Sequence, residues 1–200
     1  RPPRSTQGYS SAASDVYKGQ RIHFLYLGRI MKEKGIDELF YAVRHLKKEN
    51  ENFVLDLVGF FEDEYKEQVK ELEKHSIAHF YGFQSDPRPF YIEADCVVLP
   101  SYHEGMSNVL LEAAATGRPV ITSNIPGCRE SVENGKSGLL VEVKNKEMLY
   151  DAMKEMLHCS REEREQMGQA GREKIEREFR KEVVVEKTVQ SLREDEKRDF

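Results

Sequence analysis

Residues 100–119 read PSYHEGMSNVLLEAAATGRP, and this stretch decides the fold. The apolar run CVVL at residues 96–99 comes just before it and has the composition of a buried strand. A polar turn around Gly105 follows, and Ser107 or Asn108 can then cap a helix. A strand, a short polar turn and a capped helix in this order are typical of an α/β domain with a parallel sheet.

Two carboxylates flank the start of this helix, Glu104 in the turn and Glu112 in the helix body. Because helical side chains lean toward the N-terminus, Glu112 can reach the mouth of the turn, on the face that Asn108 occupies. The free N–H groups of the first helical turn favour an anion at the same place. This arrangement suits a ligand with phosphates and vicinal hydroxyls, such as a sugar nucleotide. The alternative is an ordinary capped helix with a solvated glutamate.

Apolar segments alternate with helical patterns over most of the chain. The predicted strands are 22–28, 53–59, 77–81, 96–99, 119–123 and 138–143. Besides the helix that ends at Thr116, the predicted helices are 37–49, 64–75, 89–93, 146–158, 161–178 and 181–193. Strands that alternate with helices predict a Rossmann-like, doubly wound parallel sheet of about six strands. Ligands bind such sheets beyond the carboxyl ends of the strands.

The composition excludes several classes of protein. The 200 residues carry a formal net charge of −5, which argues against a nucleic-acid partner. No apolar stretch approaches the length of a membrane span. The cysteines are three in number and widely spaced, which indicates a reducing compartment and matches no zinc motif. We therefore expect a cytoplasmic protein without a metal site.

The motif around the helix start also carries a family resemblance. Glu-Gly-x-Ser-Asn, a second Glu eight residues after the first, and then Ala-x-x-Gly-x-Pro-Val resemble the group 1 glycosyltransferases. These are retaining, nucleotide-sugar-dependent enzymes of the two-domain GT-B fold. The resemblance covers residues 21–190 and implies the C-terminal, donor-binding half of that fold. Residues 1–20 would then be a linker from a missing N-terminal acceptor domain, 21–180 the nucleotide-sugar-binding domain, and 181–200 a C-terminal helix and charged tail.

The resemblance extends to the loop after the first strand. The sequence GRIMKEKG at residues 28–35 is similar to the family pattern Gly-Arg-x-x-x-x-Lys-Gly. It implies that Arg29 and Lys34 hold the donor diphosphate and stabilise it as the leaving group, a role for which a guanidinium fork is well suited. The backbone N–H groups of Asn108 and Val109 would contact the same phosphates. Without the resemblance, both cations would be ordinary surface residues.

Further contacts with the donor are implied by the same resemblance. Glu112 corresponds to the family glutamate that accepts hydrogen bonds from the ribose hydroxyls, for which a carboxylate offers two oxygens. Glu104 corresponds to the glutamate beside the donor sugar and its reaction centre. The backbone groups of Gly105, Met106 and Ser107 would contact the sugar hydroxyls.

The turn Tyr81-Gly82-Phe83 is where the family holds the base. The chain departs from the family at Gly59-Phe60-Phe61, where many relatives have a second glycine. These two aromatic residues leave open whether this edge is accessible or packs against the missing domain.

We therefore interpret the chain as the donor-binding domain of a retaining glycosyltransferase. Such an enzyme transfers a sugar from a UDP- or GDP-linked donor to a glycan or glycolipid acceptor, with Glu104, Arg29 and Lys34 contributing to catalysis. No metal and no cofactor is implied, because the cations replace a divalent ion at the diphosphate. The acceptor and any contact with the inner face of the membrane are expected to involve the missing domain, and the chain alone is expected to be inactive. Two alternatives stay open: a nucleotide-sugar epimerase or phosphorylase domain of the same fold, and a non-catalytic nucleotide-binding module.

Overall fold

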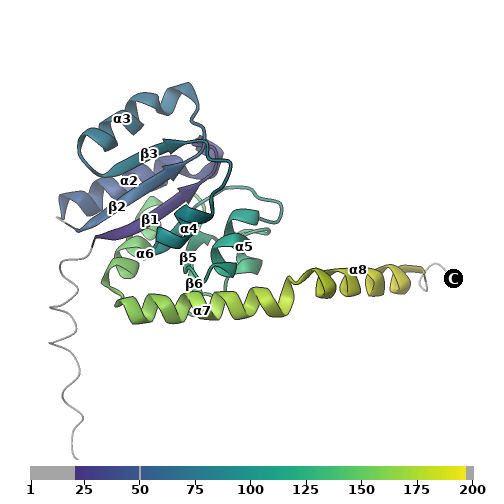
Figure 1. Ribbon diagram of the computed structural model, residues 1–200. Coiled ribbons are helices and arrows are strands. Elements are labelled where there is room, and N and C mark those ends of the chain that lie inside the picture. Colours follow the sequence, from purple (N-terminus) through teal and green to yellow (C-terminus); the bar gives the residue numbers. More distant parts are fainter. Residues whose placement is uncertain (1–20, 50, 197–200) are drawn as a thin grey trace, which may run out of the picture.

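The computed structural model describes residues 21–49 and 51–196, apart from the side chains of residues 187 and 192–196, so the predicted linker 1–20 lies outside the described residues. A six-stranded parallel sheet forms the centre of the fold, in the order β3-β2-β1-β4-β5-β6 (Figure 1). The strands are β1 (Ile22–Leu27), β2 (Phe53–Val58), β3 (Ala78–Gly82), β4 (Cys96–Leu99), β5 (Val120–Ser123) and β6 (Gly138–Val141). The predicted doubly wound sheet is confirmed, and each predicted strand lies within two residues of its observed bounds.

Helices cover both faces of this sheet (Figure 1). They are α2 (Ile36–Lys48), α3 (Lys66–Lys74), α4 (Arg88–Glu93), α5 (Asn108–Ala115), α6 (Lys146–His158), α7 (Arg161–Glu178) and α8 (Lys181–Glu196). Helix α2 packs against α6, and α5 packs against α7. The strand order runs outward in both directions from β1, and right-handed crossovers therefore place α2 and α5 on opposite faces.

Short 3-10 turns add detail that the sequence did not predict. They are η1 (Lys32–Lys34), η2 (Asp63–Tyr65) and η3 (Arg129–Ser131), and each follows the carboxyl end of a strand. Turn η1 leads into α2, and η2 leads into α3. The loops at the carboxyl edge of the sheet are therefore partly ordered by local backbone hydrogen bonds.

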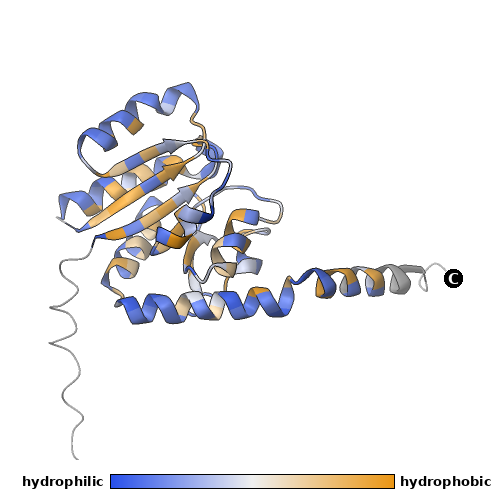
Figure 2. Ribbon diagram, in the orientation of Figure 1, coloured by the Kyte–Doolittle hydropathy of each residue, from blue (hydrophilic) through white to orange (hydrophobic). Residues whose placement is uncertain are grey.

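The strands supply most of the hydrophobic core. Every residue of β2, β4 and β5 is buried, and Phe24, Leu55 and Val97 are fully inaccessible. Figure 2 shows the apolar colour concentrated in the sheet, whereas α7 is mostly hydrophilic. Burial of both sheet faces explains why the strands are nearly continuous apolar runs rather than alternating patterns.

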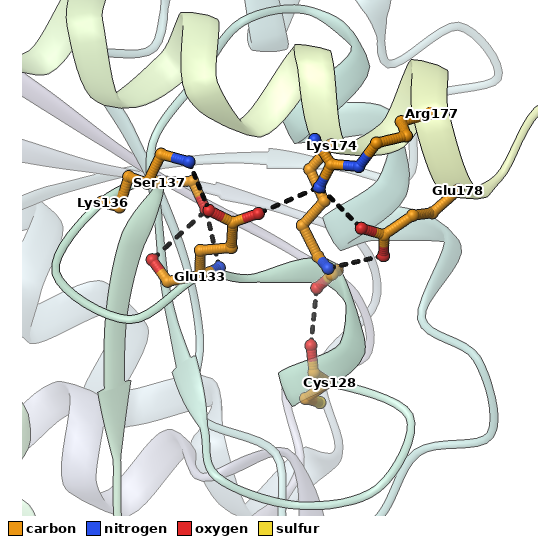
Figure 3. A network of polar contacts seen from close by, with 8 residues as sticks. Cys128, Glu133, Lys136, Ser137, Lys174, Arg177 and Glu178 are labelled. Carbon is orange, nitrogen blue, oxygen red and sulfur yellow. Dashed lines mark hydrogen bonds and ion pairs between the residues drawn. The ribbon is translucent and has the colours of Figure 1, made fainter.

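A network of ion pairs fastens the C-terminal end of α7 to the loop before β6 (Figure 3). Arg177 Nη2 contacts Glu133 Oε1 at 3.1 Å and Glu178 Oε1 at 2.7 Å. Lys174 Nζ, on a buried side chain, lies 2.6 Å from Glu178 Oε2, and Lys136 Nζ lies 2.7 Å from Glu133 Oε2. In this network the pair Arg177–Glu133 joins α7 to the loop that leads into the edge strand β6.

Candidate active site

The loops that follow β1, β4 and β5 meet at the carboxyl edge of the sheet. Gly35 has a φ of 71°, and a Cβ placed on it would lie 2.0 Å from the carbonyl oxygen of Pro100. Gly127 has a φ of 87°, and a Cβ there would lie 1.5 Å from the carbonyl oxygen of Gly105. Both positions therefore require glycine, because of backbone conformation and because of space. These contacts bring together segments that are far apart in the sequence.

The start of α5 leaves backbone donors available at this edge. Ser107, one of the two predicted capping residues, occupies the N-cap position, but its side chain makes no capping hydrogen bond. Its backbone N–H donates instead to the carbonyl of Gly127 at 3.0 Å, which fixes the loop from the other side. Within the described residues, the N–H groups of Asn108 and Val109 have no acceptor. The first turn of α5 therefore keeps the free donors that an anion requires.

Lys34 and Glu104 form the centre of the site. Lys34 Nζ, on η1, lies 2.6 Å from Glu104 Oε1, and the two side chains are 27% and 15% exposed. Ser101, which is fully buried at the end of β4, donates its hydroxyl to the same oxygen at 2.8 Å. One oxygen of Glu104 is thus held by two donors, and Oε2 has no donor in the described part of the chain.

Arg29 differs from Lys34 in its surroundings. Its side chain is exposed, and it has no hydrogen bond or ion pair with the residues that the structure describes. Its backbone is fixed, because the buried hydroxyl of Tyr26 donates to its carbonyl at 2.6 Å. Burial, followed by the charge of Glu104, raises the pKa of Tyr26, so this hydroxyl remains a donor. The site therefore contains one available guanidinium and one ammonium that is already paired.

Glu112 has a buried partner that the sequence did not predict. Tyr91 of α4 is 1% exposed, and its hydroxyl donates to Glu112 Oε2 at 2.9 Å. Burial and this hydrogen bond raise the pKa of Tyr91, which keeps the hydroxyl protonated. Glu112 itself is exposed, and its second oxygen has no donor in the described residues. One oxygen is oriented by the protein, and the other is available to a ligand.

Aromatic side chains border the site beyond β3. Phe83 is 62% exposed and stacks on Phe60, with ring centroids 5.0 Å apart and an interplanar angle of 5°. Tyr81 contacts the ring of Phe90 edge to face at 4.9 Å. Phe61 turns inward against Phe80. Of the two aromatic residues after Gly59, Phe60 is therefore exposed and Phe61 packs on the core of this domain.

Some of the predicted site residues are in direct contact with each other, and others are not. Lys34 and Glu104 are in direct contact, whereas no described hydrogen bond or ion pair links Arg29 or Glu112 to that pair. Gly105 and Met106 lie exposed between Glu104 and α5. In residues 21–49 and 51–196, no group of three or more His, Cys, Asp or Glu side chains is arranged to hold a metal ion. None of the described helices is both long enough and apolar enough to span a membrane.

The parallel sheet and its strand order define a Rossmann-like α/β domain, a class that binds ligands at the carboxyl edge of the sheet. The sequence model of the family described as glycosyl transferases group 1 matches residues 12–174. The chain belongs to the group 1 glycosyltransferases, as its motifs predicted.

Curated relatives and solved structures agree with this assignment. The capsular polysaccharide biosynthesis glycosyltransferase CapM of Staphylococcus aureus is 30% identical over 164 residues, which are 80% of this chain and 43% of CapM. Sucrose-phosphate synthase from Thermosynechococcus elongatus superposes with a TM-score of 0.74 at 26% identity, over 93% of this chain and 49% of that one. The C-terminal domain of LpcC from Francisella tularensis gives a TM-score of 0.69 at 25% identity, covering 84% of this chain and 92% of that one. The chain spans less than half of the length of curated relatives such as CapM and LpsE of Rhizobium meliloti.

Proposed function

We propose that residues 21–180 form the donor-binding domain of a retaining glycosyltransferase that acts in polysaccharide biosynthesis. The observation that carries this proposal is the junction of two loops at the carboxyl edge, where Lys34 meets Glu104 beside the start of α5. The loops come from neighbouring strands β1 and β4, where the strand order reverses and ligands of such sheets bind. The names of the relatives CapM and LpsE point to capsular polysaccharide and to lipopolysaccharide core.

The diphosphate of the donor would bind between Arg29 and the first turn of α5. Arg29 has no competing partner in the described residues, and the N–H groups of Asn108 and Val109 are unused. A guanidinium fork and free helix N–H groups are both suited to phosphate oxygens. As the sugar departs, negative charge grows on the diphosphate, and these donors stabilise it without a divalent metal.

Lys34 and Glu104 would separate when the donor binds. In the structure their charges neutralise each other, and Lys34 and Ser101 occupy one oxygen of Glu104. A diphosphate offers Lys34 a more strongly charged partner, and release of the ammonium leaves Glu104 for the donor sugar and its reaction centre. Ser101 keeps Glu104 in place after Lys34 has moved. The backbone groups of Gly105, Met106 and Ser107 would contact the sugar hydroxyls.

The nucleoside would lie between α5 and the end of β3. Glu112 would accept hydrogen bonds from the ribose hydroxyls through the oxygen that Tyr91 does not occupy. The base would contact the turn Tyr81-Gly82-Phe83, and we propose UDP or GDP as the nucleotide. A structural neighbour, HepE of Anabaena, was solved in complex with UDP.

The acceptor, a glycan or glycolipid, would bind through a further domain. The match to an isolated C-terminal domain of LpcC supports the assignment of donor and acceptor binding to separate domains. The same division assigns α8, with the residues that follow it, to a C-terminal segment outside the donor domain. A cytoplasmic location is supported by the free thiols of Cys96, Cys128 and Cys159.

Calorimetric titration tests this function. We expect UDP or GDP to bind with and without EDTA, and Arg29→Gln to lower the affinity by about 1.5–3 kcal/mol because it removes a charge-assisted contact. The uncharged nucleoside should bind the variant and the unchanged chain equally well. Arg88→Gln is the matched control, since Arg88 is an exposed arginine on α4 that pairs with Asp86. Equal losses for nucleotide and nucleoside would contradict the assignment of Arg29, and loss of binding with EDTA would indicate a metal.

The chain by itself should bind the donor and transfer no sugar. Without the acceptor half, the reaction lacks orientation and exclusion of water. An assay with radiolabelled nucleotide sugars and glycan acceptors measures this. Efficient transfer by the 200-residue chain would contradict the proposed division between donor and acceptor domains.

A further inference from the structure

A cavity of about 470 Å³ opens at the amino edge of the sheet, opposite the candidate active site. Its lining comes from the segments that precede β1, β4 and β5 and from the start of α7. Four arginines from three segments of the chain line it, namely Arg21, Arg118, and both Arg161 and Arg164 of α7. The volume lies in the range of small-molecule sites, roughly 300–1,000 Å³.

Positive charge exceeds negative charge in this lining. Among the described lining residues, the four arginines accompany three carboxylates, those of Glu93, Asp95 and Glu165, a formal excess of one positive charge. Arg161 Nε pairs with Glu165 Oε1 at 2.7 Å, while Arg164 Nη2 lies 3.8 Å from Asp95 Oδ1. A separation of 3.8 Å is too long for a hydrogen bond, so the charge of Arg164 is only partly compensated.

The remaining two arginines are held by backbone carbonyls and not by carboxylates. Arg21 donates to the carbonyls of Phe53 and Ser76 at 3.0 and 2.7 Å. Arg118 donates through Nη2 to the carbonyl of Ile92 at 2.7 Å. A carbonyl fixes the position of a guanidinium without neutralising it, so these charges remain available to an anion. Because the groups are already held, little side-chain freedom is lost when an anion binds.

The hydrogen bonding of the cluster is also incomplete. The Nε atoms of Arg118 and Arg164 are buried and have no acceptor in the described residues. Arg164 is only 5% exposed, although it lines the cavity. Burial of a guanidinium with unused donors is costly unless something else compensates its charge. The four arginines are therefore not explained as a self-contained salt-bridge network.

We propose that this amino-edge cavity binds a phosphate-bearing small molecule, at a site separate from the donor site. Guanidinium groups match phosphate oxygens with paired N–H donors, and several converging arginines favour a group with more than one negative charge. The concave shape favours a small molecule over a membrane surface. This inference does not rest on the proposed function, because the two sites lie at opposite edges of the sheet.

Binding of inorganic pyrophosphate tests the proposal. The thermal midpoint and the calorimetric affinity are measured at constant ionic strength, so that general screening does not change. The variant Arg29→Gln removes the guanidinium of the carboxyl edge, and we expect it to retain pyrophosphate binding at the amino edge.

Two arginines of α7 provide a matched pair of variants. Arg161 and Arg172 are about equally exposed, and each pairs through Nε with the glutamate four residues later. Only Arg161 lines the cavity. In the Arg29→Gln background, Arg161→Gln should lower the affinity for pyrophosphate about tenfold, as expected for one charge-assisted contact. Arg172→Gln should leave it unchanged.

A second variant and a second ligand keep the test decisive. Arg118→Gln should also lower the affinity about tenfold, with far-UV circular dichroism confirming that the fold is intact. Vesicles that contain an anionic phosphoinositide, compared with neutral vesicles, separate a lipid headgroup from a soluble ligand. The proposal is overturned if Arg29→Gln abolishes all binding, if Arg161→Gln and Arg172→Gln behave alike, or if only vesicles bind.

Discussion

The two edges of the sheet are built in different ways. At the carboxyl edge, glycines bring backbone segments into contact, and the N–H groups of Asn108 and Val109 have no acceptor in the described part of the chain. At the amino edge, long charged side chains line a cavity, and Arg21 and Arg118 are held by carbonyls. The first edge presents backbone N–H groups, and the second presents the charged groups of long side chains that are already held in position. Recognition through backbone N–H groups is therefore expected at the first edge, and recognition through guanidinium groups at the second.

Among the substitutions at the two edges, we expect Gly127→Ala to have the largest effect on stability and on nucleotide binding. Gly127→Ala places a methyl group 1.5 Å from the carbonyl of Gly105, so the loop must move. We expect a loss of about 3 kcal/mol or more in the free energy of unfolding, together with loss of nucleotide binding. Gly135→Ala is the matched control, because Gly135 has a φ of 74° and open space around it. It should cost only the backbone strain of about 1–2 kcal/mol, measured by urea denaturation. Equal costs would show that the close approach is unimportant.

Glu104→Gln tests whether Lys34 leaves Glu104 to bind the diphosphate. The change removes the anion that occupies Lys34 and should lower stability by about 1–3 kcal/mol. It should nevertheless strengthen the binding of free UDP or GDP severalfold, because the ammonium becomes available to the diphosphate. Turnover in the full-length enzyme should fall. Glu38→Gln is the control, since Glu38 accepts from Tyr102 and not from Lys34. Weaker nucleotide binding by Glu104→Gln would mean that the pair does not separate.

Tyr91→Phe tests the hydrogen bond between Tyr91 and Glu112 at the carboxyl edge. Loss of the hydroxyl leaves Glu112 without its orienting donor. We expect ribonucleotide affinity to fall by about 1 kcal/mol. The corresponding deoxyribonucleotides should lose less, because fewer ribose contacts depend on Glu112. Titration of both ligands measures the difference. A uniform loss would indicate that Tyr91 supports only the packing of α4.

We expect the smallest loss in the free energy of unfolding from substitution of the helix cap of α7, beside the amino-edge cavity. Ser160 and Glu163 form a capping box, whereas Asn145 caps α6 with a side-chain bond to Met148. Ser160→Ala and Asn145→Ala should each cost about 0.5–1 kcal/mol.

The two caps should differ in pH dependence. The backbone N–H of Ser160 lowers the pKa of Glu163. A lowered pKa stabilises the folded state above the ordinary glutamate range, and this stability is lost as pH falls through the folded value. Denaturation between pH 7 and pH 3 should therefore show an acid-sensitive contribution at α7 that Asn145→Ala does not alter. An identical pH profile for Glu163→Gln and the unchanged chain would contradict this.

The sequence predicted the fold well because hydrophobic runs and turn residues are local signals. Strand β4 reads CVVL and ends at Pro100, and α7 begins after Ser160 with Glu163 three residues later. Such patterns do not depend on distant parts of the chain. The 3-10 turn η1 was missed because three residues, Lys32–Lys34, are too few to show a period.

The candidate site was harder to predict, for a physical reason. Family motifs identified Lys34 and Glu104, but not that these side chains, 70 residues apart, contact each other. Tyr91 appeared only as an apolar residue of a short helix, and its bond to Glu112 depends on how α4 packs on α5. The arginines of the amino edge share no motif, since Arg21, Arg118 and Arg161 come from three separate segments. The strand order brings Arg21 and Arg118 together, and the packing of α7 against α5 adds Arg161.

The central position of β1 has a consequence for folding kinetics. This strand pairs with β2, which follows closely in the chain, and with β4, where Phe24 lies opposite Cys96. The pairing with β4 closes a long loop and is therefore expected late, and Lys34 cannot meet Glu104 before it forms. A bound nucleotide should thus slow unfolding and leave the refolding rate nearly unchanged, which stopped-flow measurements can show. The donor site then acts as a reporter of the last step of folding.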